Sequence, residues 1–405
     1  MRPNQPEIEE KMTTATSNSA DALLGVYRQS GPILVRGEGS YIVAEGGARY
    51  LDFASGIAVN ALGYGDPDFK AAVQQALEDG LVHVSNLFRT RPAAELAQWL
   101  VEHSFADRVF FCNSGAEANE GAIKFARRWA REQGGEHKTE VVAFHGSFHG
   151  RTMGALAATD RPAYQEPFRP LMPGVRFGQV GDVAAADRLI RRDRTAAVII
   201  EPIQAEGGVL PVPPAFLKAL RYLCDEAGAL LIYDEVQVGL GRTGTLWAHE
   251  QAGVTPHLMT VAKPLAGGLP MGAVLMTDEV AQAIKPGDHA TTFGGGPLVA
   301  SAALATVRTI GEPSFLSEVQ RKGHLLANLL QRLVLDHPGT VRDVRGAGLI
   351  WGIEIEGAAG EVAARALDAG LLVCSAGPNV VRIVPPLVIG DDELAEGVEI
   401  LNEVL

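Results

Sequence analysis

Short apolar runs alternate with longer amphipathic stretches through the middle of the chain. The run at 195–203 is apolar and rich in β-branched residues, which is typical of a parallel strand buried on both faces. The pattern predicts helices at 116–132 and 214–227. It predicts strands at 107–113, 139–146, 195–203, 229–236, 258–263 and 272–277. Alternating strands and helices indicate an α/β fold, with a mostly parallel sheet covered by helices on both faces.

The pattern changes after residue 296. A long helical stretch is predicted over 297–337, and short strands follow at 348–355, 370–376 and 380–386, which indicates a smaller α+β domain. An early hairpin at 39–53 is expected to join it. The expected division is therefore a flexible tail at 1–20, a small domain formed by 21–66 and 300–405, and a large domain at 67–299.

Composition narrows the classes of partner. The 405 residues are 47% hydrophobic and 20% charged, with a net charge of −13, so the chain is globular and acidic. The sequence has no basic stripe, which argues against nucleic acid and anionic membranes as partners. The polar start of the chain does not resemble a secretory signal, and no run approaches the roughly 18 apolar residues of a membrane helix. Three widely separated cysteines fit a reducing cytoplasm.

An aspartate and a lysine stand at the ends of two neighbouring apolar runs. Asp234 ends the run at 230–234, and Lys263 lies between a short apolar run and a glycine-rich turn. A lysine can form a Schiff base with a carbonyl cofactor, and a carboxylate can keep a proton on a pyridine nitrogen. The pair therefore predicts pyridoxal phosphate (PLP) as the cofactor, and the rest of the chain should supply a phosphate cradle and groups that bind substrate carboxylates.

Two glycine-rich segments are candidates for these roles. Ser114 and Gly115 follow a strand and begin a helix, where backbone N–H groups favour an anion; a simple capped helix start, with Glu117 three residues on, explains the same pattern. At 143–152, Phe148 could stack on a flat ring and Arg151 could bind a carboxylate. A metal site at His145 and His149 is the weaker interpretation, because glycines break the helix that such spacing needs.

Three further segments are ambiguous when taken alone. The carboxylates Glu201 and Glu206 end a buried strand, where they could serve acid–base chemistry or be ordinary charged groups. The glycines at 239–244 match the dinucleotide pattern GxGxxG, but no clear helix begins there and no acidic residue follows at the required distance. Thr291 and Thr292 precede a helix and could donate to an anion, or could belong to an ordinary loop.

Taken together, these segments resemble one family. The chain carries, in the same order and at the same spacing, VRGEGSYI, LDFASGIAVNALGYGDP, HVSNLF, FCNSGAEANE, FHGRT, EPIQAEGG, YDEVQVGLGRTG, AKPLAGGLP and TTFGG. From about residue 27 to residue 401 it resembles the class III PLP-dependent aminotransferases of fold type I, and more narrowly the acetylornithine and ornithine aminotransferases. The resemblance implies ping-pong transfer of the terminal amine of an ω-amino acid, best matched by N2-acetylornithine, to 2-oxoglutarate in arginine biosynthesis.

The resemblance also implies roles for individual residues. Lys263 would hold PLP and move the proton, and Asp234 would pair with the ring nitrogen. The remaining cofactor contacts would come from Ser114, Gly115 and Ala116 at the phosphate, Phe148 on the ring face, Gln237 near the ring hydroxyl, and Thr292 at the phosphate of the neighbouring subunit. The active sites would therefore be shared in a homodimer.

Substrate recognition would use two arginines. By the same resemblance, Arg151 would bind the carboxylate remote from the reacting amine, and Arg382 would bind the α-carboxylate of glutamate. Glu206 would mask Arg382 while the ω-amine reacts and release it when glutamate binds. Tyr27 and Thr291 are further candidates for substrate contacts.

The sequence departs from the family pattern near the substrate. Ala205 replaces a commoner glycine, Ala290 and Thr291 replace Gly-Ser, and Gly296 replaces a frequent asparagine. Ornithine, succinylornithine, 4-aminobutyrate and carrier-bound aminoadipate semialdehyde therefore remain as alternative donors or products. A fold-type-I aminomutase or decarboxylase is a further alternative, although the Glu206–Arg382 pair would then have no obvious role.

Overall fold

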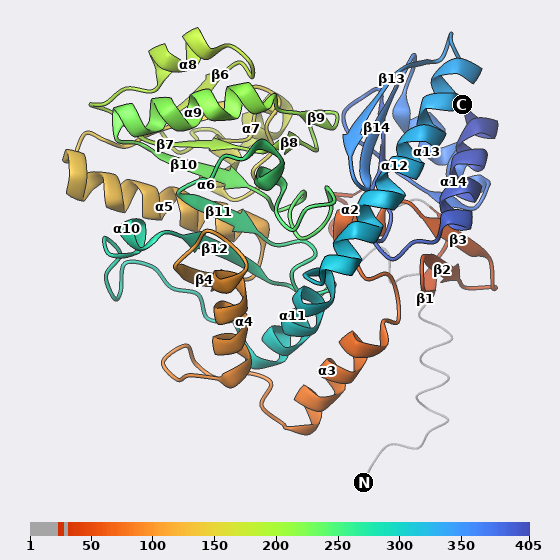
Figure 1. The fold of residues 1–405 in the computed structure, drawn as a ribbon, viewed down its shortest axis with the longest axis horizontal. Coiled ribbons are helices and arrows are strands. Elements are labelled where there is room, and N and C mark those ends of the chain that lie inside the picture. Colours follow the sequence, from red (N-terminus) through yellow and green to blue (C-terminus); the bar gives the residue numbers. More distant parts are fainter. Residues whose placement is uncertain (1–22, 28–30) are drawn as a thin grey trace.

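A seven-stranded sheet forms the centre of the larger part of the protein (Figure 1). The computed structural model describes residues 23–27 and 31–405, so the expected tail at 1–20 lies outside the described residues. The strand order is β4-β12-β11-β10-β7-β5-β6. The strands are β4 (Arg108–Cys112), β5 (Glu140–Phe144), β6 (Val175–Gly178), β7 (Thr195–Ile200), β10 (Leu230–Asp234), β11 (Leu258–Val261) and β12 (Gly272–Met276). Only β12 runs antiparallel to its neighbours, so the predicted α/β fold with a mostly parallel sheet is confirmed.

Helices cover both faces of this sheet, and short helices and turns connect the rest. The longer helices are α3 (Pro67–Glu78), α4 (Arg91–Glu102), α5 (Gly115–Gly134), α8 (Val183–Leu189), α9 (Pro214–Ala227), α11 (Pro297–Ile310), α12 (Pro313–Asp336), α13 (Ala359–Asp368) and α14 (Asp391–Val404). The shorter ones are α2 (Ser55–Ala58), α6 (Met153–Ala157), α7 (Pro162–Gln165), α10 (Asp278–Ala281), η2 (Glu166–Phe168) and η3 (Ala248–Ala252). No helix in the described part of the chain is long and apolar enough to cross a membrane.

The alternation of side chains along β10 decides which face carries its last residue. Leu231 and Tyr233 pack in the apolar cluster that contains α9, whereas Leu230 and Ile232 pack in the cluster that contains α5. Because side chains alternate between the two faces of a strand, Asp234 follows Leu230 and Ile232 onto the α5 face. A buried carboxylate is therefore directed towards the first turns of α5.

The smaller part of the protein contains two four-stranded sheets. One has the order β1 (Leu34–Glu38), β2 (Tyr41–Ala44), β3 (Arg49–Asp52) and β15 (Leu371–Leu372), and the other has β13 (Val341–Ala347), β14 (Ile350–Ile355), β17 (Val380–Ile383) and β16 (Cys374–Ser375). The run predicted as one strand at 370–376 is thus two strands, in different sheets, with Val373 between them. A separate pair, β8 (Ile203–Gln204) and β9 (Leu210–Pro211), is antiparallel.

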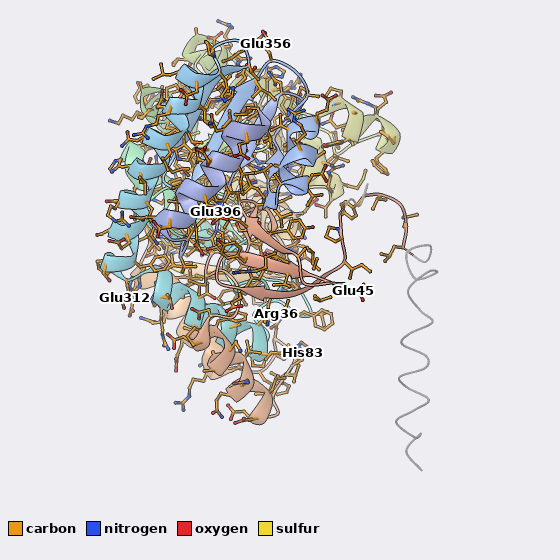
Figure 2. All side chains as sticks on the ribbon, turned by 90° about the vertical axis from the view of Figure 1, so that its right-hand side faces the viewer. Arg36, Glu45, His83, Glu312, Glu356 and Glu396 are labelled. Atoms are coloured by element: carbon orange, nitrogen blue, oxygen red, sulfur yellow. The ribbon has the colours of Figure 1, made fainter. Side chains whose placement is uncertain are left out.

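The N-terminal hairpin and the C-terminal segment share one of these sheets. β15 pairs in parallel with β3, with Leu371 opposite Leu51. The hydroxyl of Tyr41 donates to the carboxylate of Glu396 on α14 at 2.9 Å, on the face shown in Figure 2. Segments more than 300 residues apart in sequence are therefore packed together, as expected for the hairpin at 39–53.

The helical stretch predicted at 297–337 is broken into α11 and α12. Gly311 follows α11, and a Cβ atom there would lie 2.4 Å from the indole of Trp99, so the close approach of α4 requires glycine. Pro313 then begins α12, as proline commonly does at the first helical position. α11 packs on α3 and α4, whereas α12 packs on α14 and β13. These contacts place α11 with the helices of 67–299 and α12 with the C-terminal segments, so the change falls at the break near Gly311. The division into a large domain at 67–299 and a small domain made of 21–66 and 300–405 stays a prediction.

Candidate active site

A cavity of about 260 Å³ lies at the carboxyl ends of four parallel strands. Phe148 follows β5, Glu201 follows β7, Asp234 ends β10 and Lys263 follows β11 by two residues, and all four line the cavity. Ligands of open parallel sheets bind in such crevices, because the loops after successive strands converge at this edge. The first and the last of these four residues are more than 100 positions apart in the sequence, and the parallel arrangement of the strands brings all four together.

Lys263 reaches the cavity from the buried end of β11. Burial lowers the pKa of its ammonium to about 8, and the positive charge of Arg382 acts in the same direction. The carboxylates of Glu206 and Asp234 oppose the shift but do not cancel it. At pH 7 roughly a tenth of the amine is therefore unprotonated, far more than for an ordinary lysine, and this is the form that attacks a carbonyl group.

Asp234 is held in place by three donors. Its Oδ2 accepts from Nδ2 of Asn119 at 2.7 Å and from Nδ1 of His149 at 2.8 Å, and its Oδ1 accepts from the backbone N–H of Val236 at 3.0 Å. Because an ionised carboxylate only accepts hydrogen bonds, the proton of this contact lies on Nδ1 of His149. Oδ1, with one donor, retains capacity for a further N–H from a ligand in the cavity.

Asn119 completes this arrangement, although the sequence analysis did not select it. Its Oδ1 accepts from the hydroxyl of Thr260 at 2.8 Å, and its Nδ2 also donates to the carbonyl of His149 at 2.7 Å. The signal was present in SGAEANE, because Asn119 lies four residues after Gly115 and so falls on the same face of α5. The two histidines considered as a metal pair contact separate carboxylates, His145 with Asp160 and His149 with Asp234.

The first turn of α5 forms a narrow end of the cavity. Ser114 is the N-cap, with its hydroxyl accepting from the N–H of Glu117 at 3.2 Å, and Gly115 and Ala116 line the cavity. A Cβ atom on Gly115 would lie 2.6 Å from the side chain of Val236, so only glycine fits. The helix start is thus both capped and open to the cavity, which is the geometry that suits an anionic group.

Gly150 holds the opposite wall of this narrow end. Its φ of +133° lies in a region that other residues rarely adopt, and a Cβ atom there would lie 2.8 Å from that of Ala116. The loop that carries Phe148 and Arg151 therefore approaches the start of α5 as closely as the backbone permits. Sequence analysis identified both glycine-rich segments, and the structure places them against each other.

Two arginines at or beside the cavity are in opposite states: Arg151 lines it, whereas Arg382 adjoins it through its contact with Gln237. Arg382, on β17, is buried and donates to Glu206 and to Oε1 of Gln237, the latter at 2.9 Å. Gln237 also donates to Glu206 at 3.3 Å, so these three residues form one cluster, called here the Glu206 cluster. Arg151 is exposed, and its guanidinium lies over the ring of Tyr164. One arginine is thus covered by a carboxylate, and the other faces an open space.

The charges of the Glu206 cluster keep its carboxylate ionised. Burial alone would raise the pKa of Glu206, but Arg382 and Lys263 lower it overall. The Nε of Arg382 also donates to the thiol of Cys374 at 3.4 Å. Gln237, selected from the sequence as a cofactor contact, therefore also belongs to the group that surrounds Arg382.

Glu201 is a buried carboxylate that joins two walls of the cavity. It accepts from the backbone N–H of Phe148 at 2.9 Å and from that of Ala205 at 3.3 Å. Burial raises the pKa of Glu201 to about 7, the charge of His149 opposes the rise, and that of Asp234 adds to it. The residue fixes the loop of Phe148 relative to the loop of Glu206, a role that its position at a strand end did not reveal.

Six of the selected residues do not line this cavity: Ser114, Glu206 and Arg382 adjoin or contact residues that do, whereas Thr291, Thr292 and Tyr27 lie apart from it. Thr291 and Thr292 line a separate hollow of about 290 Å³ with Asn113 and Glu117, and the hydroxyl of Thr291 accepts from Asn113 at 3.1 Å. Tyr27 is 79% exposed and is not among the residues that line the cavity. A function for Thr292 at a neighbouring subunit stays a prediction, as do the contacts expected of Tyr27 and Thr291.

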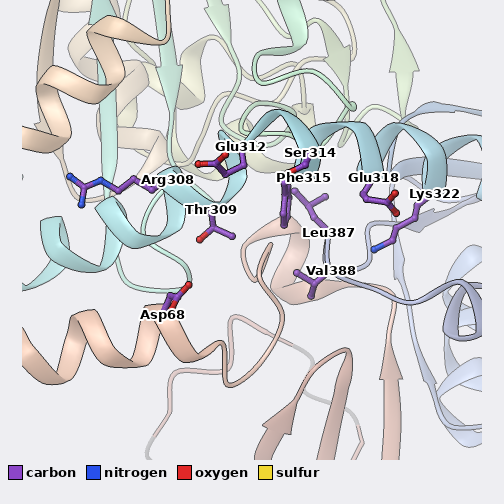
Figure 3. A pocket seen from close by; sticks show the side chains of 10 residues that line it. All are labelled: Asp68, Arg308, Thr309, Glu312, Ser314, Phe315, Glu318, Lys322, Leu387 and Val388. Atoms are coloured by element: carbon purple, nitrogen blue, oxygen red, sulfur yellow. The ribbon is translucent and has the colours of Figure 1, made fainter.

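A larger hollow, of about 660 Å³, lies elsewhere on the protein (Figure 3). It runs between α3, the join of α11 and α12, and the loop at 387–388, and its charged lining includes Asp68, Arg308, Glu312 and Lys322. None of the residues selected as catalytic or binding lines it. The smaller cavity at the strand ends is therefore the candidate active site.

Comparison with known proteins identifies relatives over nearly the whole chain. The sequence pattern of the class-III aminotransferases matches residues 27–405. An acetylornithine aminotransferase from Alnus glutinosa, described as mitochondrial, is 53% identical over 95% of this chain and 85% of its own length. Acetylornithine aminotransferase 1 of Bradyrhizobium diazoefficiens is 46% identical over 96% of this chain and 95% of its own.

Solved structures agree with these relatives. The N-acetylornithine aminotransferase of Stenotrophomonas maltophilia superimposes with a TM-score of 0.82 at 39% identity, covering 93% of this chain and 96% of the other. The ornithine aminotransferase of Toxoplasma gondii superimposes with a TM-score of 0.92 at 28% identity, covering 100% and 98%. The similarity thus extends over the whole described fold.

Proposed function

The chain belongs to the class-III aminotransferases, and from that premise we propose that it moves the terminal amine of N2-acetylornithine to 2-oxoglutarate. Enzymes of this class use PLP. When bound, PLP withdraws electrons from the substrate carbon and carries the amine between the two half-reactions. The substrate assignment rests on the acetylornithine aminotransferases of Alnus glutinosa and Bradyrhizobium diazoefficiens, at 53% and 46% identity, and on the two arginines of the site.

The residues of the cavity fit this cofactor. We propose that Gly115 and Ala116, with the capped start of α5, hold its phosphate, and that Oδ1 of Asp234 accepts the ring N–H. Phe148 and Val236 both line the cavity and would cover the two faces of the ring. Lys263 would bind the aldehyde carbon, because its amine is partly unprotonated near neutral pH.

Each side chain then has one task in the transfer. Nζ of Lys263 would take the proton from the amine-bearing carbon of the substrate and deliver it to the cofactor carbon that receives the amine, and in the second half-reaction it would carry out the same transfer in reverse, onto the keto carbon of 2-oxoglutarate. Asp234, fixed by Asn119 and His149, keeps the ring nitrogen protonated.

The main observation behind this proposal is that Arg151 is exposed, whereas Arg382 is paired with the carboxylate of Glu206. We propose that Arg151 binds the carboxylate of N-acetylornithine, while Glu206 covers Arg382 and leaves room for a flexible amine-bearing chain. When 2-oxoglutarate enters, its carboxylate next to the keto group displaces Glu206 and binds Arg382, and its other carboxylate binds Arg151. One site thereby accepts two substrates of different shape in turn.

A second copy of this chain would complete the site. Exposed apolar side chains gather where the segment 84–88 meets the loop of Thr291: Leu87 is 88% exposed, Phe88 67% and Phe293 65%. Nδ2 of Asn86 donates to the carbonyl of Thr291 at 2.5 Å and fixes this surface. Such patches are typical of protein interfaces, so we propose a homodimer in which Thr292 approaches the neighbouring phosphate.

Absorbance of the PLP-loaded protein tests the function directly. N-acetylornithine, succinylornithine, ornithine, 4-aminobutyrate and glutamate are added separately, without a keto acid, and the visible band of the bound cofactor is followed. We expect N-acetylornithine and glutamate to remove the band and 2-oxoglutarate to restore it. Removal by a different ω-amine alone would reassign the donor, and a protein that never acquires the band would refute the proposed role of Lys263.

A further inference from the structure

Arg151 is held by aromatic faces rather than by carboxylates. Its guanidinium carbon lies 3.4 Å from the centroid of the Tyr164 ring and 5.8 Å from that of Phe148. Within residues 23–27 and 31–405, no ion pair or side-chain hydrogen bond engages its N–H groups. A stacked guanidinium leaves its N–H edge free, and that edge matches the two oxygens of a carboxylate.

The backbone that carries Tyr164 is held in place. Tyr164 lies on the short helix α7, where its N–H donates to the carbonyl of Arg161 at 2.9 Å. The neighbouring Gln165 is buried and donates to the carbonyls of Leu156 and Thr159 at 3.1 and 2.8 Å. The ring of Tyr164, which is more than a third exposed, therefore extends from an anchored turn.

The same turn also contacts the loop of the Glu206 cluster. Nη2 of Arg161 donates to the carbonyl of Glu206 at 2.8 Å. The side chain of Arg161 thus joins the turn that carries Tyr164, on which Arg151 stacks, to the backbone of Glu206, which pairs with Arg382.

We propose that Tyr164 is a positioning residue that determines specificity, because its ring holds the N–H edge of Arg151 towards the substrate carboxylate. The inference rests on the carboxylate-binding role proposed above for Arg151. An exposed arginine without this face would have to lose much of its rotamer freedom each time a substrate binds. The enzyme would consequently favour ω-amines that carry a carboxylate over simple alkylamines.

The test compares Tyr164→Leu and Tyr164→Phe with the wild type, all loaded with PLP. Tyr222→Leu is the matched control, because Tyr222 lies on α9 with its side chain 64% exposed. Binding of N-acetyl-2-aminopentanoate, which keeps the carboxylate and lacks the terminal amine, is measured by calorimetry. The half-reactions with N-acetylornithine and with pentylamine are measured by absorbance.

We expect Tyr164→Leu to weaken the binding of N-acetyl-2-aminopentanoate about five-fold, because the lost cation–π contact contributes about 1 kcal/mol. The half-saturating concentration of N-acetylornithine should rise by a similar factor. Tyr164→Phe and Tyr222→Leu should stay within about two-fold of the wild type. The response to pentylamine should not change, because that amine has no carboxylate for Arg151.

Other outcomes overturn the inference. Unchanged binding in Tyr164→Leu would show that the ring does not position Arg151, and an equal loss with pentylamine would show a general structural effect. Tyr164→Gln repeats the comparison if the leucine variant does not retain PLP. If the wild type reacts with none of the carboxylate-bearing amines, the proposed function fails by itself, and the calorimetric comparison still decides whether Tyr164 supports carboxylate binding.

Discussion

Replacing Glu206 by glutamine should change the preference of the enzyme between its two amino donors. The substitution keeps the shape of the side chain and removes the negative charge that covers Arg382. A carboxylate that enters the site then displaces a neutral amide instead of an anion. Glutamate and 2-oxoglutarate should bind more tightly, while the response to N-acetylornithine should not improve, because its amine gains nothing from an uncovered arginine.

The contacts of Arg382 set the size of the effect. Its side chain is 1% exposed and that of Glu206 is 25% exposed, so the pair is only partly screened. A charged hydrogen bond contributes roughly 1.5–3 kcal/mol, and the partial exposure of Glu206 favours the lower end of that range. About 1.5 kcal/mol corresponds to roughly ten-fold tighter binding of the α-carboxylate. A similar free energy is lost from the folded protein without ligand, partly offset because Gln237 still accepts from Arg382.

Single half-reactions provide the assay. The rate of loss of the visible band is measured against the concentration of glutamate, and separately of N-acetylornithine, for the wild type and Glu206→Gln. The pKa of Glu206 is lowered in the folded protein, so its contribution to stability is present above its ordinary value of 4.5 and lost at lower pH, and the assay at neutral pH observes the intact pair. An unchanged ratio of the two half-saturating concentrations would refute the view that Glu206 covers Arg382.

Further predictions concern the amine, the thiol and the backbone of the site. In the cofactor-free protein, the rate of PLP attachment should rise with pH through about 8, because the pKa of Lys263 in the folded protein lies below its ordinary value of 10.5. For the same reason, Lys263 should make the folded state more stable as the pH rises from about 8 to 10.5. A rate of attachment that does not change with pH would contradict the assignment. Cys374→Val removes an acceptor 3.4 Å from Nε of Arg382, so the KM for 2-oxoglutarate should rise about three-fold while the ω-amine half-reaction and the Cys374→Ser control stay unchanged. Gly150→Ala should lower the free energy of unfolding by about 2 kcal/mol and weaken the retention of PLP during dialysis, because φ at this position is positive and the added Cβ would meet Ala116. Thermal unfolding and PLP retention equal to those of the wild type would instead show that the loop can move.

Local sequence patterns were sufficient for the strands that carry the chemistry. The apolar run ending at Asp234 predicted both the strand and the place of the carboxylate, because a buried parallel strand has a simple signature. The break between α11 and α12 was not predicted, although Gly311 and Pro313 mark it, because the apolar periodicity continues on both sides. β13 was also not predicted, since its charged and partly exposed residues give little apolar signal.

The candidate site depended more on tertiary structure. Glu206 and Arg382 are 176 residues apart, and no periodicity relates them; their pairing was an expectation from family resemblance. Asn119 was not selected because its function depends on three partners from different elements, Asp234, His149 and Thr260. Local patterns predict elements and the residues at their ends, whereas contacts between elements require the fold.

The split at Val373 gives the N-terminal hairpin a direct connection to substrate handling. Leu371 and Leu372 pair with β3, and one residue later Cys374 pairs with Arg382 itself. The single residue Val373 therefore connects the two sheets, and this connection is too short to absorb a displacement of either sheet. A shift of the first strands of the chain would be transmitted to Arg382, the arginine proposed to bind the keto acid. Loss or mispairing of the hairpin would consequently appear first as a defect in accepting 2-oxoglutarate, before the large domain loses its cofactor.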